Sequence, residues 1–205
     1  MPTRPSLSRR ALLGAGVRGG AAVALAATGA GLLAGQAAAA SGLLADQDLA
    51  LARLAAAAEL LSIEFYSRAA DSGRFAGGEL KALKRALFNE QEHLAAVSGI
   101  LTGAGQTPPA ADDFDFAFPD GSFASEAAVA RLGVTLETAA VGIYVGAAAA
   151  FGPADLRSAA ASIAASEAQH LGWHSSLAVG RPIGISFPAP LDLAAASTAL
   201  APYLG

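Results

Sequence analysis

The sequence predicts an all-α protein: a four-helix bundle with one long crossover loop and a short helix in its C-terminal tail. Alanine dominates, hydrophobic residues make up 54% of the chain, and the β-branched and aromatic residues that favour strands are sparse. Glycine- and proline-containing breaks separate four long apolar segments, and the last two segments repeat the polar pattern of the first two. We expect an export signal over residues 1–40, the bundle over 41–180 and a tail over 181–205.

Residues 1–40 are expected to direct export and then to be removed. A basic start ends in Arg9 and Arg10, and a Gly- and Ala-rich apolar stretch follows as far as Leu33. This arrangement resembles the twin-arginine signal, and small residues up to Ala40 offer a cleavage site. The stretch is also about long enough to span a bilayer, so a retained membrane anchor is the alternative. The expected location is the periplasm, the cell wall or the extracellular space, reached through the twin-arginine machinery.

The first two bundle helices are expected over residues 46–70 and 79–102. Asp46 or Asp48 can cap the first helix, since a side-chain carboxylate at this position accepts hydrogen bonds from free backbone N–H groups. Glu79 lies in the first turn of the second helix, where the helix dipole favours an acid. Glycine-containing breaks end both helices.

Residues 105–124 are long for a structureless connection inside a compact domain. A crossover along the side of a bundle accounts for this length, because it joins two helices that run the same way. Four phenylalanines are expected to pin the loop to the bundle: Phe114, Phe116, Phe118 and Phe123. Three acids could bind a cation, although a solvated loop is the preferred interpretation: Asp112, Asp113 and Asp115.

The third and fourth helices are expected over residues 125–150 and 153–179. Pro153 suits the start of the fourth helix, where its missing N–H costs nothing. Within the tail, a short helical pattern from Asp192 to Leu200 is expected to pack on the outside of the bundle.

A Glu–x–x–His motif occurs twice, at Glu90–His93 and again at Glu167–His170. Residues three apart on a helix lie on one face, so each carboxylate points the same way as its imidazole. Two such helices facing each other would present a set of ligands for a pair of transition metals. A surface Glu–His pair on each helix is the alternative, but apolar neighbours such as Leu94 argue for an inward direction.

The other two helices share a second pattern. Glu59 precedes Tyr66 by seven residues, or two helical turns. Glu137 precedes Tyr144 by the same interval. The helical region is therefore interpreted as a degenerate duplication of one helical hairpin. An ordinary surface acid is a weak alternative for the two glutamates, because apolar or small residues flank both.

This combined pattern resembles the ferritin-like di-metal carboxylate superfamily, which includes ferritins, rubrerythrins, exported bacterial ferritin-like proteins and manganese catalases. The resemblance covers about residues 45–180 and implies six metal ligands: Glu59, Glu90, His93, Glu137, Glu167 and His170. By this resemblance Glu90 and Glu167 bridge the two metals. One further Glu and one His bind each metal, and Tyr66 and Tyr144 hydrogen-bond ligand carboxylates.

Two divalent cations would neutralise the four buried carboxylates, which would otherwise repel one another. Imidazole with carboxylate suits iron, manganese or zinc, and the sequence does not select among them. By the resemblance, iron is the first expectation and manganese the second. Two features depart from rubrerythrins: Ala140 replaces an additional Glu ligand, and the chain has no Cys for a rubredoxin-like iron site. Glu64 is interpreted as a non-ligand. His174 is expected to cap a helix or lie at the surface, and the alternative is that it assists proton transfer or binds a third metal.

The resemblance implies an oxidoreductase whose di-metal site reacts with O2 or peroxide, in a ferroxidase-like or a peroxidase- or catalase-like reaction. One alternative is a metal-binding or storage protein, possibly a homo-oligomer, and another is a stress-protection domain without turnover. From residue 41 onward the chain has nine basic and seventeen acidic residues. The sequence therefore has no basic patch that would indicate nucleic acid as a partner.

Overall fold

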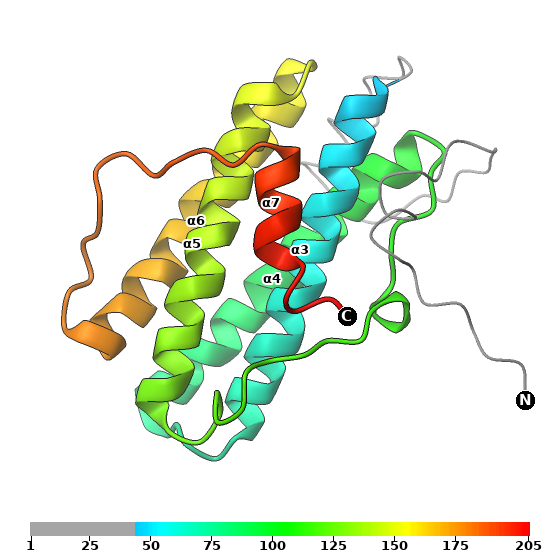
Figure 1. The fold of residues 1–205 in the computed structure, drawn as a ribbon. Coiled ribbons are helices and arrows are strands. Elements are labelled where there is room, and N and C mark those ends of the chain that lie inside the picture. Colours follow the sequence, from blue (N-terminus) through cyan, green and yellow to red (C-terminus); the bar gives the residue numbers. More distant parts are fainter. Residues whose placement is uncertain (1–43) are drawn as a thin grey trace, which may run out of the picture.

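The computed structural model describes residues 44–205, whose regular elements are all helices, with no strand in that range (Figure 1). The predicted export signal and its cleavage site lie outside the described residues. Four long helices form the bundle, with a short 3-10 turn in the crossover and one short tail helix: α3 (Asp46–Asp71), α4 (Gly77–Gly103), η1 (Ala111–Asp113), α5 (Glu126–Ala150), α6 (Ala154–Val179) and α7 (Leu193–Leu200). The predicted fold class is confirmed.

The bundle consists of two antiparallel hairpins, α3 with α4 and α5 with α6, which pack together through α3–α5 and α4–α6 contacts (Figure 1). The connection over residues 104–125 returns along the side of the bundle, so that α4 and α5 run in the same direction (Figure 1). This is the predicted crossover.

Side chains cap the first turn of two of the described α-helices. Ser125 caps α5 by accepting a hydrogen bond from the Ala128 N–H, and Asp192 caps α7 in the same way. The prediction that Asp46 or Asp48 caps α3 is wrong, because Ala45 occupies the cap position. Asp48 is instead buried, and its Oδ1 accepts the backbone N–H of Gly152 at 3.1 Å. It satisfies a donor in the α5–α6 turn rather than one on its own helix.

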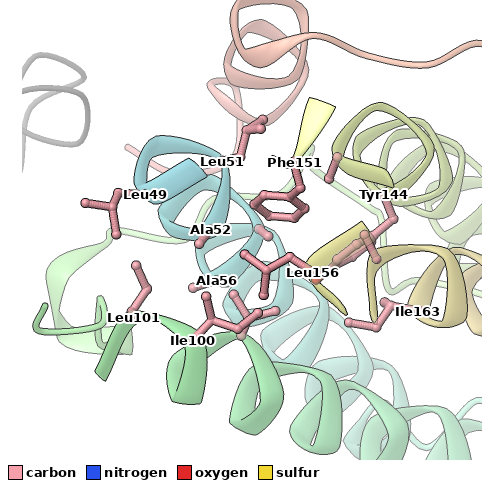
Figure 2. Close-up of a cluster of buried hydrophobic side chains, with 14 of the residues drawn as sticks. Leu49, Leu51, Ala52, Ala56, Ile100, Leu101, Tyr144, Phe151, Leu156 and Ile163 are labelled. Carbon is pink, nitrogen blue, oxygen red and sulfur yellow. The ribbon is translucent and has the colours of Figure 1, made fainter. Parts of the chain in front are cut away.

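Two clusters of buried apolar side chains hold the bundle together. The first joins the start of α3, the end of α4, the end of α5 and the start of α6, and includes Leu49, Leu101, Phe151 and Leu156 (Figure 2). The second includes Phe65, Leu83 and other residues toward the opposite end of the bundle. Alanine lines much of α3, and its small side chain lets neighbouring helices approach closely.

The crossover is pinned by aromatic residues, as predicted. Phe116, Phe118 and Phe123 pack against the second apolar cluster. Phe114 does not reach this cluster and instead contacts the Phe116 ring, with 5.6 Å between ring centroids. The loop's backbone is also fixed to the tail, because Ala117 N–H donates to the Tyr203 carbonyl at 3.0 Å.

The tail helix α7 packs against α3 and α5, which agrees with the predicted position outside the bundle (Figure 1). Just before α7, the Leu191 N–H donates to the Gly142 carbonyl at 2.9 Å. A Cβ at Gly146 would clash with the Leu191 carbonyl oxygen, so a glycine is required there for this close approach. By length and composition alone α5 could cross a membrane, but most of its apolar stretch is buried within the bundle.

Candidate metal centre

Each of the four bundle helices places one glutamate in the interior. Their exposed fractions are between 0% and 2%: Glu59 on α3, Glu90 on α4, Glu137 on α5 and Glu167 on α6. Burying a single unpaired carboxylate costs several kcal/mol, and four together repel one another. Such a concentration of acid in an apolar bundle therefore requires compensating positive charge.

The two histidines point into the same volume. His93 Nδ1 lies 3.4 Å from Glu90 on its own helix and 2.8 Å from Glu167 on α6. His170 Nδ1 lies 3.1 Å from Glu167 on its own helix and 2.9 Å from Glu90 on α4. The Glu–x–x–His spacing thus sets both side chains on the inner face, and each imidazole reaches the glutamate of the facing helix.

These six residues form two overlapping groups whose ligand atoms lie within 4.8 Å of one another. One group is Glu59, Glu90, His93 and Glu167, and the other is Glu90, Glu137, Glu167 and His170. Glu90 and Glu167 belong to both groups. Each group combines carboxylate oxygen with imidazole nitrogen, a donor set that suits iron, manganese or zinc. The structure therefore brings all six predicted residues together into two positions that could each hold a metal ion.

The tyrosines cross between the two halves of the bundle. Tyr66 on α3 donates its hydroxyl hydrogen bond to Glu137 on α5, and Tyr144 on α5 donates to Glu59 on α3. Both rings are buried. Each tyrosine occupies one oxygen of a carboxylate and leaves the other oxygen free to face the centre.

The remaining oxygens do not have enough hydrogen-bond donors. In the described part of the chain, the buried atoms without an aligned partner include Glu59 Oε2, both oxygens of Glu90, Glu137 Oε2 and Glu167 Oε1. Each histidine Nδ1 carries at most one hydrogen and faces three carboxylates, so the two imidazoles cannot satisfy them all. Divalent cations would coordinate these oxygens and balance their negative charge.

Glu59 and Glu137, which each belong to only one group of candidate ligands, resist ionisation. Burial and then repulsion from Glu90 and Glu167 raise the pKa of the Glu59 carboxyl well above its usual value, against the effect of His93. Burial and then repulsion from Glu167 and Glu90 likewise raise the pKa of the Glu137 carboxyl. Without metal, the cluster therefore favours bound protons over four negative charges.

Glu90 and the two histidines, by contrast, favour their charged forms. Burial opposes ionisation of Glu90, but the surrounding histidines outweigh it and lower its pKa to about 2. Burial also disfavours charged histidines, yet the carboxylates around each ring raise the pKa of His93 to about 12 and of His170 to about 9. Without metal, protons on the histidines therefore supply part of the missing positive charge.

The structure adds Asn89, which the sequence did not single out, and places His174 differently from the expectation. Asn89 Nδ2 lies 3.1 Å from His170 Nε2, the ring nitrogen that faces away from the carboxylates. His174 is fully buried, and its Nε2 lies 3.1 Å from the Tyr66 hydroxyl. The expectation that His174 caps a helix or lies at the surface is therefore wrong. Its position one turn after His170, on nearly the same face, was the available signal.

Two other acids lie outside the cluster. Glu64 forms a surface ion pair with Arg68, one turn later on α3, at 2.6 Å. Glu92 is half-buried on α4 and belongs to neither group of candidate ligands. Ala140 is buried in the bundle and offers no ligand atom.

Fold and site together define a helical-bundle protein with a buried glutamate–histidine cluster that could bind a metal. The model of the ferritin-like domain family matches residues 47–179, which includes all four bundle helices almost completely. The chain belongs to this ferritin-like family. Among curated proteins, none matches its sequence.

Proposed function

We propose that the protein binds two iron or manganese ions between its four helices and reduces O2 or peroxide there. One observation carries the proposal: Glu90 and Glu167 belong to both groups of candidate ligands. Two carboxylates that face two positions at once are suited to bridge two ions. Glu59 and His93 would complete one position, and Glu137 and His170 the other.

The chain's own side chains support such a centre in three ways. Four carboxylates would balance the charge of two divalent cations, so the loaded site would be neutral. Tyr66 and Tyr144 hold Glu137 and Glu59 by hydrogen bonds, which restricts the direction of each free carboxylate oxygen. The apolar clusters restrict the access of bulk water to the centre. The two ions, when bound, would supply the electrons that reduce the oxidant.

The site also favours a small oxidant over a large substrate. Five of the six candidate ligands are buried, and within the described structure only His93 among them is partly exposed. A diatomic molecule or peroxide is small enough to reach such a centre, whereas a bulky organic substrate is not. Because the sequence has no Cys for a rubredoxin-like iron site, repeated reduction of O2 would take its electrons from a separate donor, whereas in a catalase-like reaction a second peroxide would supply them.

We further propose that the protein works outside the cytoplasm, after export through the twin-arginine route. Arg9 and Arg10 followed by the Gly- and Ala-rich stretch support this proposal. That route carries folded proteins, so metal could be inserted before export.

An anaerobic reconstitution followed by an oxidant tests the reaction. Purified protein is loaded with Fe²⁺, or separately with Mn²⁺, and then mixed with O2 or hydrogen peroxide. We expect stoichiometric oxidation of Fe²⁺, or consumption of peroxide, in the wild type. Glu90→Gln should lose most of this activity, while Glu92→Gln, the same substitution two residues away and outside both groups, should keep it. Metal binding with no oxidation under any of these conditions would point to a binding or storage protein instead.

A further inference from the structure

The two halves of the duplicated bundle differ beside the metal centre. Aligning the two Glu–x–x–His motifs pairs Asn89 with Ser166, and His174 with Val97. Asn89 contacts His170, and His174 contacts the Tyr66 hydroxyl, which in turn donates to Glu137. All of these contacts therefore support one of the two candidate metal positions, the one that includes Glu137 and His170.

Asn89 can form a hydrogen bond with His170 whichever hydrogens the ring carries. When only Nδ1 carries a hydrogen, the amide N–H of Asn89 can donate to Nε2. When Nδ1 is a metal ligand, or when both ring nitrogens carry a hydrogen, Nε2 donates and the amide oxygen can accept after the amide rotates by half a turn. His93 has no such partner among the described residues, and its ring is partly exposed.

His174 occupies a space that the fold provides for it. A Cβ at Gly133 would clash with the His174 ring, so a glycine on α5 makes room for this imidazole. The corresponding residues of the other half are Ala55 and Val97, which are both buried in the first apolar cluster. Tyr66 is thus held between a carboxylate and a buried imidazole. Tyr144 contacts its carboxylate without a histidine behind it, among the residues that the structure describes.

We infer that the two metal positions are unequal: the Glu137–His170 position binds the first ion, and the Glu59–His93 position binds the second. This inference rests on the proposed di-metal function. Ligands that are already held in place lose less freedom when an ion binds, so their position has the higher affinity. Asn89 and His174 act as positioning residues, because neither is itself in a group of candidate ligands.

Calorimetric titration of chelator-treated protein with Co²⁺ tests the order of filling, and Co²⁺ visible absorption reports the coordination of each ion. Two steps in the wild type are not enough, because repulsion between two nearby cations weakens the second step even for equal positions. The variant Asn89→Ser, which copies the residue of the other half, separates the two cases. If the positions are unequal, it lowers the affinity of the first step about tenfold to a hundredfold and leaves the second nearly unchanged.

Three further variants make the test specific. Asn89→Asp keeps an acceptor for the Nε2 hydrogen of a metal-bound His170, so the first step should return to nearly wild-type affinity. His174→Val, which copies the other half, should also lower mainly the first step. Gln91→Ser, an exposed polar residue on the same helix, should change neither step. Thermal melting of each metal-free variant shows that it is folded before titration.

The reverse pattern overturns the inference: a first step within about twofold of wild type and a weakened second step in Asn89→Ser would mean that the Glu59–His93 position binds at least as tightly as the Glu137–His170 position. Equal loss in both steps, or no effect of Asn89→Ser and His174→Val, also overturns it. If the wild type binds no Co²⁺ at all, the proposed di-metal function itself fails. The two failures are therefore distinguishable.

Discussion

Tyr66 on α3 donates its hydroxyl hydrogen bond to Glu137 on α5, and not to Glu59, which lies two turns earlier on its own helix. In the same way, Tyr144 on α5 donates its hydroxyl hydrogen bond to Glu59 on α3. Each half of the duplicated bundle therefore holds a carboxylate of the other half. The two hairpins are interlocked at the level of the candidate metal centre, so neither hairpin alone contains a complete half-site.

Removal of the Tyr66 hydroxyl tests this interlock. Tyr66→Phe leaves Glu137 Oε1 and His174 Nε2 without their hydrogen-bond partner, at a cost of about 1–3 kcal/mol in the free energy of unfolding for buried groups. Metal affinity should also fall, by about tenfold. Chemical denaturation and calorimetric titration measure the two effects. Tyr203→Phe in the half-buried tail should stay within about 0.5 kcal/mol of wild type. No change in either quantity for Tyr66→Phe would contradict the role given to this hydroxyl.

The metal-free protein should become less stable as the pH rises from about 5.5 to about 8.5. Glu59 and Glu137 have raised carboxyl pKa values, so the folded protein keeps protons that the unfolded chain releases above about 4.5. His170 and His93, with pKa values raised to about 9 and about 12, keep protons that the unfolded chain releases above 6.5. Both effects favour the folded state at low pH and are lost as the pH rises.

Two groups act in the opposite direction. Burial lowers the pKa of His174 to about 3, so its effect opposes the trend only up to about pH 6.5 and is smaller than the combined effect of the two glutamates. Glu90 acts below the range. Its lowered pKa of about 2 contributes stability that is present above about 4.5 and is lost only in stronger acid. Melting temperatures of chelated protein at several pH values give the measurement. A melting temperature that rises steadily from about pH 5.5 to about pH 8.5 would disagree with the charge balance described for the cluster.

The space around His174 gives a third prediction. Gly133→Ala would place a Cβ against the buried imidazole, and overpacking of this kind costs about 1–3 kcal/mol. Gly78→Ala, in the first turn of α4 with nothing within 4 Å of the added Cβ, should be neutral or slightly stabilising. In a His174→Val background the penalty of Gly133→Ala should shrink, since the pair then copies Ala55 and Val97. A double-mutant cycle measures this coupling, and purely additive effects would argue against the contact.

Export gives a fourth prediction. Replacement of both Arg9 and Arg10 by lysine should leave the full-length chain in the cytoplasm, because the twin-arginine signal depends on this pair. Arg4→Lys, a matched change nearer the N-terminus, should leave export intact. Fractionation of cells that express each variant gives the answer. Normal export of the double variant would show that a different route, or none, is used.

Local sequence features predicted most of the fold. Gly and Pro breaks placed both ends of each of the four bundle helices within about two residues. The length of the crossover predicted that the two helices it joins run in the same direction. The Glu–x–x–His spacing predicted that Glu90 and His93 share one face, because helical periodicity alone decides this, and apolar neighbours such as Leu94 indicated that the face points inward. The same holds for Glu167 and His170. These relations depend on one helix at a time.

The features that the sequence did not reveal depend on how helices rotate against one another. Tyr66 is on the same face as Glu59, and only the packing of α3 against α5 shows that it contacts Glu137 instead. Asn89 contacts His170 because α4 and α6 bring their inner edges together. Asp48 has the right residue type for a cap, but it is turned inward toward the N–H of a distant turn. Spacing along the chain carries no information about such partners.

Metal content and thermal melting of protein purified from its native compartment test the central claim most directly. We expect two iron or manganese ions per chain. We also expect a lower melting temperature after chelation, with a larger loss at about pH 8 than at about pH 5.5. An ion present at 100 times its dissociation constant adds about 2.7 kcal/mol of stability for a single site. Glu90→Gln should bind metal more weakly and should lose less stability on chelation. Protein that retains no metal and melts at the same temperature before and after chelation would contradict the di-metal centre.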